Sequence, residues 1–437
     1  MNTSLPQPAP ARCDILIIGA GPAGMAAALA AAPSGAAITL VDDNPEAGGQ
    51  IWRDGPGASL PPLARQHREA LARHTNITLL RGTRVVGLGD APTAGEAPTL
   101  LLEDAEHGWA QHSHRLILCT GARELLLPFP GWTLPGVTGA GGLQALVKAG
   151  LPVQGQRIVV AGTGPLLLAA AATAAKAGAQ VVRVAEQAGW RALAGFAMQL
   201  PRWPAKAMQA LTLLQPQLRA GSHVLEAQGD GQVQAVRLRT PSGEESIACE
   251  RLACGFGLVP NTHLGQMLGC ALGGPLSHGL GLQVDAQMRT SVAGVYAAGE
   301  CTGFGGSERA LAQGALAGHA AANHTTPVQA LQATLRRWEG FAQALQHSFA
   351  LNDALKTLAR PDTLVCRCED VPHAELVGRS GWIDAKLRTR CGMGACQGRI
   401  CGAATQQLFG WTPAPARHLL APARIATLAA APGDPPG

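Results

Sequence analysis

The stretch that decides the fold runs from Asp14 to Gln50: DILIIGAGPAGMAAALAAAPSGAAITLVDDNPEAGGQ. Ile15 to Ile18 form a short apolar run that is typical of a strand buried on both faces, and GAGPAG follows it directly. Pro22 suits the first turn of a helix, and a run of alanines continues that helix to Pro33. A second apolar strand follows at Ile38 to Val41. The order strand, glycine-rich turn, helix and strand predicts an α/β dinucleotide-binding fold.

Each residue of the glycine-rich turn has its own task. Gly19 allows the tight turn, Ala20 and Gly21 bring backbone against a pyrophosphate, and Gly24 lets the helix lie close to its strand. The phosphates then meet the positive end of the helix. The alternative is a glycine-rich turn without a ligand, but the strand before the motif and the helix after it are the context that a nucleotide site requires.

Two acidic residues follow the second strand. Asp42 and Asp43 lie 23 and 24 residues after Gly19 (42 minus 19, 43 minus 19), where a carboxylate can accept the hydroxyl groups of a ribose. Both are therefore candidate cofactor-binding residues.

A second unit of the same kind begins at Arg157 with RIVVAGTGPLLLAAAATAAKAGAQVVRVAEQ. Gly162 and Gly164 match the first two glycines of the motif, Leu167 replaces the third, and Glu186 falls 24 residues after Gly162 (186 minus 162). A carboxylate there prefers a free ribose 2′-hydroxyl, which favours NAD(H) or an adenine nucleotide over NADP(H). The alternative is a structural domain that binds no nucleotide.

The repetition predicts the domain order. Two such units, followed by a return segment near Val295 to Glu300, describe one nucleotide-binding domain that is interrupted by another. From Val328 to Phe349 apolar residues recur in steps of three and four, which predicts a helix. The expected domains are 1–150 with 281–326, an inserted domain at 151–280, linker helices at 327–360, a cysteine-rich domain at 361–412 and an extended tail at 413–437.

These motifs resemble the flavoproteins with two dinucleotide-binding domains, of the glutathione-reductase-like layout. The resemblance implies that the first site binds FAD, and that Gly49 and Gln50 wrap the flavin side of it. It further implies that backbone near Val85 borders the adenine, that Gly121 lies beneath the cofactor, and that Glu300 approaches the ribityl and phosphate region. From the residues alone, Val85 fits a plain sheet edge and Glu300 a helix-capping acid.

Composition excludes several classes of protein. The hydrophobic share is 47% of 437 residues and the formal charge is +5, without an aromatic-studded basic stripe, so nucleic acid is not an expected partner. No apolar run is long enough for a transmembrane segment. The opening MNTSLPQPAPARCD lacks the pattern of a secretory signal, so we expect a floppy leader and a cytoplasmic, reducing location.

Five of the eleven cysteines gather in LVCRCEDVPHAELVGRSGWIDAKLRTRCGMGACQGRIC. Cys366 and Cys368 form one pair, and Cys396 and Cys401 form the other. Four thiolates in two close pairs are what a [2Fe–2S] cluster requires. Zinc is the competing metal, since it also accepts four thiolates, and buried cysteines without a metal are the third possibility. Cys391 is a fifth sulfur that could replace one ligand.

The cysteine segment resembles the bacterioferritin-associated-ferredoxin-like [2Fe–2S] domain. The whole chain, from GAGPAG and GGQIWR through GTGPLLL and VYAAGE to the cysteines, resembles the α subunits of hetero-oligomeric amino-acid and opine dehydrogenases. That group includes opine oxidase, D-hydroxyproline dehydrogenase, archaeal dye-linked proline dehydrogenase and hydrogen cyanide synthase.

The resemblance to these α subunits implies a function. It implies an electron-relay subunit whose partner is an amino-acid-oxidase-like β subunit, with NAD(H) or ATP in the second nucleotide site. A flavin accepts two electrons as a hydride, and a cluster carries one electron at a time. The combination of the two cofactors therefore describes electron transfer toward an acceptor. Two alternatives stay open: a stand-alone NAD(H)-linked flavin and iron–sulfur reductase, and a non-enzymatic redox-sensing or binding scaffold. The residues do not single out a catalytic group.

Overall fold

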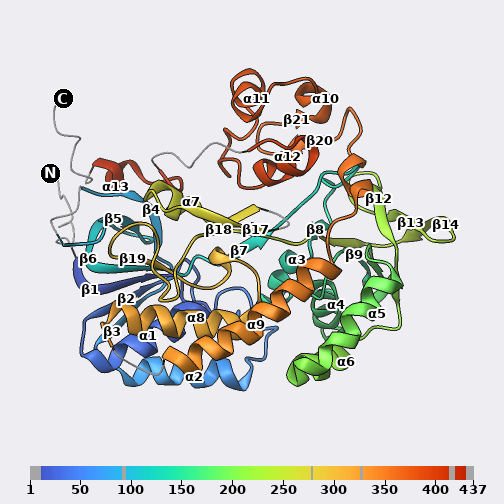
Figure 1. The fold of residues 1–437 in the computed structure, drawn as a ribbon. Coiled ribbons are helices and arrows are strands. Elements are labelled where there is room, and N and C mark those ends of the chain that lie inside the picture. The colour runs from blue at the N-terminus through green and yellow to red at the C-terminus, as the bar shows by residue number, and fades with distance from the viewer. Residues whose placement is uncertain (1–10, 91–94, 277–278, 325–327, 413–418, 430–437) are drawn as a thin grey trace.

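The structure is a computed structural model that describes residues 11–90, 95–276, 279–324, 328–412 and 419–429 (Figure 1). Most of the expected N-terminal leader and the terminal APGDPPG lie outside these residues. Within the described part of the chain, two α/β domains and a small cysteine-rich domain are present. We call residues 361–412 the cysteine module, and Figure 1 draws it in red beside the two larger domains.

The first domain is built on a sheet with the strand order β3-β2-β1-β6-β5-β4, in which β19 also pairs with β6. Strands β1, β2 and β3 are parallel, so their carboxyl ends share one edge of the sheet. Since β19 follows the whole second domain in the chain, the first domain is discontinuous, as predicted. The strands are β1 (Ala11–Ile18), β2 (Ile38–Val41), β3 (Ile77–Leu80), β4 (Arg84–Leu88), β5 (Leu100–Glu103), β6 (Gly108–Leu118) and β19 (Val295–Ala297).

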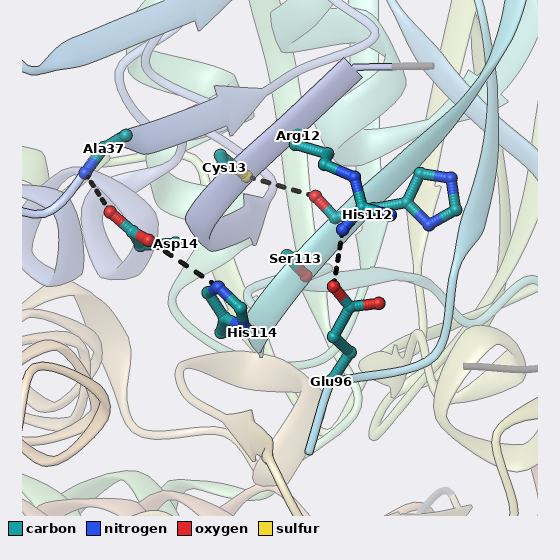
Figure 2. Close-up of a pocket in the computed structure, with 8 residues that line it drawn as sticks. All are labelled: Arg12, Cys13, Asp14, Ala37, Glu96, His112, Ser113 and His114. Carbon is teal, nitrogen blue, oxygen red and sulfur yellow. Dashed lines mark hydrogen bonds and ion pairs between the residues drawn. The ribbon is translucent and has the colours of Figure 1, made fainter. Parts of the chain in front are cut away.

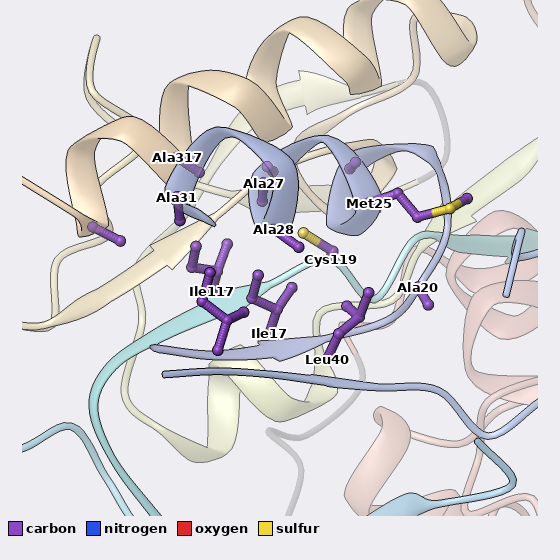
Figure 3. Packing of buried hydrophobic residues seen from close by; sticks show 14 of the residues in the cluster. Ile17, Ala20, Met25, Ala27, Ala28, Ala31, Leu40, Ile117, Cys119 and Ala317 are labelled. Atoms are coloured by element: carbon purple, nitrogen blue, oxygen red, sulfur yellow. The ribbon is translucent and has the colours of Figure 1, made fainter. Parts of the chain in front are cut away.

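Small residues let two helices that cover this sheet, α1 and α8, pack closely against each other. The helices of the domain are α1 (Pro22–Ala31), α2 (Pro62–Arg73) and α8 (Gly306–Ala321). On α8, a Cβ at Gly314 would lie 2.0 Å from the carbonyl oxygen of Ala23 on α1, and one at Gly318 would lie 2.2 Å from that of Ala27. Figure 3 shows the alanines of α1 lying over Ile17 and Ile117 of the sheet. The alanine-rich sequence thus serves close helix packing rather than helix propensity alone.

The second domain has a five-stranded sheet in the order β11-β10-β9-β15-β8. Its strands are β8 (Val137–Gly139), β9 (Arg157–Gly162), β10 (Gln180–Glu186), β11 (Leu218–Ala220) and β15 (Arg251–Gly255), and its helices are α3 (Ala140–Lys148), α4 (Leu166–Lys176), α5 (Trp190–Gln199) and α6 (Pro204–Leu213). A separate antiparallel sheet contains β12 (His223–Gln228), β13 (Ala235–Thr240) and β14 (Gly243–Ala248). The second domain is expected to begin at residue 151. Strand β8 lies before that residue but already pairs with β15 of the second sheet, so this sheet begins earlier in the chain than expected.

Short strands connect the two domains. They are β7 (Ala122–Glu124) and β16 (Leu258–Pro260), which pair with each other. Helix α7 (His263–Met267) and the hairpin of β17 (Leu272–Leu276) and β18 (Gly279–Leu282) follow β16 in the chain. Strand β7 leaves the first domain and β16 returns to it, so the two crossings lie side by side.

The predicted linker helix is α9 (Val328–Ser348). Its aromatic residues pack with those of α5, with the Phe196 and Phe341 rings 6.1 Å apart at their centroids. The cysteine module then follows, with β20 (Leu364–Cys366), β21 (Val371–Pro372), α10 (His373–Leu376), α11 (Trp382–Thr389) and α12 (Cys401–Phe409).

The C-terminal tail differs from its prediction. Residues Ile425–Ala429 form helix α13, so the extended conformation expected for 413–437 is wrong there. Thr427 is buried and donates a hydrogen bond to Glu103 on β5 over 2.7 Å. The backbone nitrogen of Arg424 also donates to Glu103, over 2.8 Å. The prolines of the tail suggested an extended chain, but docking on the first domain provides partners for a short helix.

Candidate functional site

The first glycine loop leaves no room for side chains. Gly19 has φ +102°, and a Cβ there would lie 2.3 Å from the carbonyl oxygen of Cys119. A Cβ on Gly24 would lie 1.8 Å from the carbonyl oxygen of Gly19. Gly21 faces Gly49, where a side chain would meet the Cα of Gly21 at 3.1 Å. This backbone cradle, at the carboxyl edge of the parallel strands and the amino end of α1, fits the phosphates of a dinucleotide.

The two acidic residues after β2 have different surroundings. Asp42 is buried, and its carboxylate accepts hydrogen bonds from the backbone nitrogens of Ala20 (2.6 Å) and Asn44 (2.8 Å). Asp43 is exposed and accepts a hydrogen bond from the Asn44 amide over 3.0 Å. Asp42 thus fixes the glycine loop itself, while Asp43 has a carboxylate at the surface of the site.

Two residues that the sequence did not single out order the next loop. Arg53 donates to the side-chain oxygens of Asn44 (2.8 Å) and Gln50 (3.0 Å). Polar residues in a loop after GGQ carry no distinctive pattern, so only the fold reveals that they hold the 42–53 segment together.

The remaining residues expected near FAD lie on three different segments. Val85 is buried on β4, and Gly121, with φ +66°, has no atom within 4 Å of where a Cβ would be. Glu300 begins the 3-10 turn after β19. Burial raises the pKa of Glu300, and the charge of Arg309 opposes that rise.

Gln313 is the residue of this region that sequence reasoning missed. It lies buried on α8, and its side-chain oxygen accepts hydrogen bonds from the backbone nitrogen of Gly299 (2.9 Å) and the hydroxyl of Thr302 (3.0 Å). It therefore fixes the turn that carries Glu300. One buried glutamine among the small residues of α8 is the only sequence signal, and it is a weak one.

A pocket lies at the end of the first sheet that is opposite to the first glycine loop (Figure 2). The residues that line it come from the start of β1, from the middle of β6 and from the segment with Glu96. Arg12 lies 2.6 Å from Glu96, and His114 lies 3.9 Å from Asp14. Ligands of open α/β sheets bind at the carboxyl ends of the strands. This pocket is at the amino end of β1 and is not the candidate cofactor site.

The second glycine loop has a similar frame. Gly162 has φ +138°, and a Cβ there would lie 1.8 Å from the carbonyl oxygen of Gly255. Glu186 is buried and accepts hydrogen bonds from the backbone nitrogens of Gly164 (2.7 Å) and Ala188 (2.8 Å). Burial raises the pKa of Glu186 to about 7, despite these hydrogen bonds.

A segment from far along the chain lies on this second loop. Thr163 donates its hydroxyl to the carbonyl oxygen of Phe349 (3.3 Å), and Gln187 donates to that of Ala350 (2.9 Å). The backbone nitrogen of Asn352 donates back to Gln187 over 3.0 Å. The chain after α9 thus occupies one side of the second candidate nucleotide site, a contact that no local pattern indicates.

The structure gathers the cysteines of the module. The Sγ atoms of Cys366, Cys391 and Cys401 lie within 4.8 Å of one another, and all three residues are buried. Cys368 is exposed and Cys396 is partly buried, and neither belongs to this group of three sulfurs. The structure therefore brings together two of the four predicted ligands, Cys366 and Cys401, and the third sulfur of the group is Cys391.

The backbone around the sulfurs turns through strained conformations. Cys391 lies between Arg390 (φ 64°) and Gly392 (φ 82°), and Gln397 (φ 51°) follows Cys396. A Cβ on Gly392 would lie 2.5 Å from the ring of Trp382. Arg390 ends helix α11 in this left-handed conformation, and Gln397 lies within the loop that carries Cys396.

The thiols share protons unequally. The neighbouring thiols of Cys391 and Cys401 lower the pKa of Cys366 to about 2, whereas Cys366, Cys391 and Cys396 raise the pKa of Cys401 far above its usual value. A hydrogen bond from Cys401 lowers the pKa of Cys396 to about 5. Thiolates are the form of cysteine that binds metal, so this donor set fits an iron–sulfur cluster and also fits zinc.

Two glycine cradles on interleaved α/β domains, with a return strand in the first sheet, define a flavoprotein oxidoreductase with two dinucleotide-binding domains. Residues 13–323 match the family model described as pyridine nucleotide-disulphide oxidoreductase. The chain belongs to this family and is a flavin-dependent oxidoreductase.

Known proteins resemble the chain over nearly its whole length. The A subunit of opine oxidase from Rhizobium meliloti (strain 1021) is 33% identical, over 89% of this chain and 90% of that protein. Hydrogen cyanide synthase subunit HcnB of Pseudomonas protegens is 32% identical, over 88% of this chain and 89% of that protein. The predicted resemblance to this group of subunits is confirmed.

Solved structures agree with the fold. The L-proline dehydrogenase from P. horikoshii has a TM-score of 0.68 and 18% identity, with 98% of this chain and 81% of that chain covered. The T. acidophilum thioredoxin reductase has a TM-score of 0.53 and 24% identity, over 71% of this chain and 98% of that chain. In the described residues, the helices are too short or too polar to span a bilayer.

Proposed function

We propose that this chain is the electron-relay α subunit of a hetero-oligomeric dehydrogenase that acts on amino acids, imino acids or opines and contains FAD and a [2Fe–2S] cluster. The observation that carries the proposal is the union of the first glycine cradle and the cysteine group in one polypeptide. The similarity to the opine oxidase protein over nearly the full length of both chains supports it.

The residues of the first site divide the task of holding FAD. Gly19, Gly21 and Gly24 admit the phosphates to backbone, and Asp43 offers its carboxylate to the ribose. Glu300 lies on the turn that Gln313 holds and would approach the ribityl region of FAD. When bound, FAD accepts two electrons as a hydride and can release them one at a time, and a [2Fe–2S] cluster carries one electron.

The cysteine module would hold the cluster through Cys366, Cys368, Cys396 and Cys401. After the neighbouring thiols, the backbone nitrogens of Gly392 and Glu369 contribute to lowering the pKa of Cys366, and those of Ile400 and Gly398 contribute to lowering the pKa of Cys396. Hydrogen bonds from backbone nitrogens to sulfur stabilise thiolate charge and tune the reduction potential of a cluster. The same contacts would support zinc, so metal analysis is part of the test.

The proposed partner is a β subunit that resembles amino-acid oxidases and oxidises the C–N bond of the substrate. Both relatives are named as subunits, which supports an assembly of this kind. The relay subunit would then pass electrons to an acceptor and would carry no substrate oxidation of its own.

The test is co-expression with the neighbouring genes, compared with expression of this chain alone. We expect a yellow-brown complex with iron, acid-labile sulfide and flavin, and dye reduction by amino, imino or opine substrates only in the presence of the partner. A monodisperse single chain that oxidises such a substrate at the rate of the complex would disprove the relay role. Zinc in place of iron and sulfide would disprove the cluster.

A stand-alone NAD(H)-dependent flavin and iron–sulfur reductase is the second candidate, and the second glycine loop with Glu186 favours it. That loop would take NAD(H) or ATP. Anaerobic mixing of the isolated chain with NADH separates the candidates. Bleaching of the flavin within the dead time of ordinary mixing supports the reductase, while no bleaching together with ATP binding supports the relay subunit.

A further inference from the structure

One arginine connects the first domain to the cysteine module. Arg123 lies on β7, two residues after Gly121, and its Nε donates a hydrogen bond to the carbonyl oxygen of Arg399 over 2.8 Å. Arg399 lies between Cys396 and Cys401 in the chain. A single side chain therefore joins the turn expected beneath the flavin to the loop expected at the cluster.

The first-domain end of this connection is tightly fixed. Arg123 also donates to the side-chain oxygen of Asn261 (3.0 Å) and to the carbonyl oxygen of Pro260 (3.2 Å). Asn261 in turn donates to the carbonyl oxygen of Thr120 over 3.0 Å, and its backbone nitrogen donates to that of Gly121 over 3.0 Å. Any shift of Arg123 would therefore disturb the Thr120–Gly121 turn.

The module end is fixed as well. The guanidinium of Arg399 donates to the carbonyl oxygen of Cys396 over 3.3 Å and is also hydrogen-bonded to the carbonyl oxygen of Leu420. The backbone nitrogen of Leu420 donates to the carbonyl oxygen of Val86 on β4 over 2.7 Å. The loop with Cys396 and Cys401 is thus tied to the first domain both through Arg123 and through the tail.

The charges suit a thiolate centre. Arg123 and Arg399 are both half-buried and point at the same loop, and two like charges so close together repel each other. Negative thiolates nearby compensate that repulsion, and a metal cluster with thiolate ligands carries net negative charge. A guanidinium presents its N–H donors in a rigid planar fork, whereas an ammonium group is a compact charge on a flexible stem.

We infer that Arg123 is a positioning residue. It fixes the position of the Cys396–Cys401 loop relative to the Gly121 turn, and so sets the rate of electron transfer between the two cofactors. The inference rests on the proposed function, because it assigns the connection to flavin and cluster. A displacement of one redox group from the other slows electron transfer between them, because the tunnelling rate falls with distance.

The experiment compares Arg123→Lys with Arg360→Lys in the full chain. Lysine keeps the charge but loses the fork. Arg360 is the matched control, because it also joins the linker to a larger domain, through Glu226 at 2.6 Å, but away from Gly121. Hydrogen–deuterium exchange is read over 120–123 and 396–401, and a flash photoreductant then delivers one electron to the flavin while cluster absorbance is followed.

In Arg123→Lys we expect about tenfold faster exchange in both segments, the effect of losing one hydrogen bond to a charged group. Electron transfer from the flavin to the cluster should be slower than in the wild type. Arg360→Lys should leave both segments and the rate unchanged. Asn261→Ala, which breaks only the first-domain end, should change exchange in the same two segments if the lysine variant does not fold.

Exchange at wild-type rates in both Arg123→Lys and Asn261→Ala would overturn the inference, and so would uniform acceleration over the whole chain. Hydrogen–deuterium exchange can be measured whether or not the protein contains its cofactors. A colourless protein therefore disproves the proposed function, whereas unchanged exchange in a coloured protein disproves the role of Arg123.

Discussion

The sulfur atoms of Cys366 and Cys401 lie within 4.8 Å of each other, although β20 carries the first and α12 begins with the second. The two residues enter the centre from opposite ends of the cysteine module. Both sulfurs also belong to the buried apolar core of the module, so metal ligation and packing share the same residues. A bound metal would therefore stabilise the module as well as serve electron transfer.

Replacing Cys401 should remove the metal and leave the flavin. The Cys401→Ser variant loses a buried thiol in contact with three others, whereas the FAD cradle lies in another domain. We expect iron to fall below a tenth of wild type, about the effect of losing one ligand, with flavin content unchanged. Iron and flavin analysis of the purified variant measures both.

Cys270→Ser is the matched control for this variant. Cys270 is equally buried but lies in the first domain, where its thiol contacts Thr290. It should keep both cofactors. Loss of flavin together with iron in Cys401→Ser would mean that the two sites do not fold independently.

The fifth sulfur gives a separate test. The predicted ligand set contains Cys396, yet Cys391 and not Cys396 belongs to the group of three sulfurs formed with Cys366 and Cys401. We expect Cys396→Ser to lose iron and Cys391→Ser to retain it with an unchanged visible spectrum. The reverse result would make Cys391 the fourth ligand and Cys396 a neighbour of the cluster.

The first glycine loop makes a prediction about packing. In Gly24→Ala the new Cβ would lie 1.8 Å from the carbonyl oxygen of Gly19, so α1 must move away from β1. Such overpacking costs about 1–3 kcal/mol, and the displaced helix end no longer meets the phosphates. We expect lower flavin content and a lower denaturant midpoint.

Gly195→Ala tests whether the effect is specific to that position. Gly195 lies within α5, and a Cβ there would meet no atom within 4 Å. Alanine should stabilise this helix by up to about 1 kcal/mol and leave flavin content unchanged. A Gly24→Ala protein with full flavin content would show that the close approach is not needed for binding.

The sequence predicted the parts of this structure that depend on local patterns. The GAGPAG loop, the strands beside it and helix α9 follow from glycine geometry and from the 3.6-residue period, so their positions are confirmed. The interrupted first sheet followed from the repeat of the motif, and β19 confirms it. These features need no knowledge of distant contacts.

The parts that the sequence could not supply are contacts between distant segments. Spacing alone did not show that Asp42 would bind Ala20 and leave Asp43 exposed. It could not indicate that the Phe349–Asn352 segment lies on the second loop, or that Arg123 reaches Arg399. Each depends on where two separately folded elements meet, which no periodicity encodes.

The second glycine loop should make stability depend on pH through Glu186. Its pKa is raised from 4.5 to about 7 in the folded chain, so between these values the folded state holds a proton that the unfolded state has released. Stability therefore falls as pH rises from about 4.5 to 7 and is flat above. The full effect is roughly 3 kcal/mol, from about 1.4 kcal/mol for each pH unit.

Glu186→Gln should lack that fall, because the amide does not titrate. Relative to wild type, the variant should gain about 3 kcal/mol in free energy of unfolding between pH 4.5 and pH 8. Denaturant unfolding at several pH values, followed by the fluorescence of the tryptophans, measures the difference. Glu250→Gln, at an exposed glutamate of the same domain, is the control for losing a carboxylate. A constant difference between Glu186→Gln and wild type across this range would mean that Glu186 is ionised in the folded protein, with its charge stabilised by the backbone nitrogens of Gly164 and Ala188.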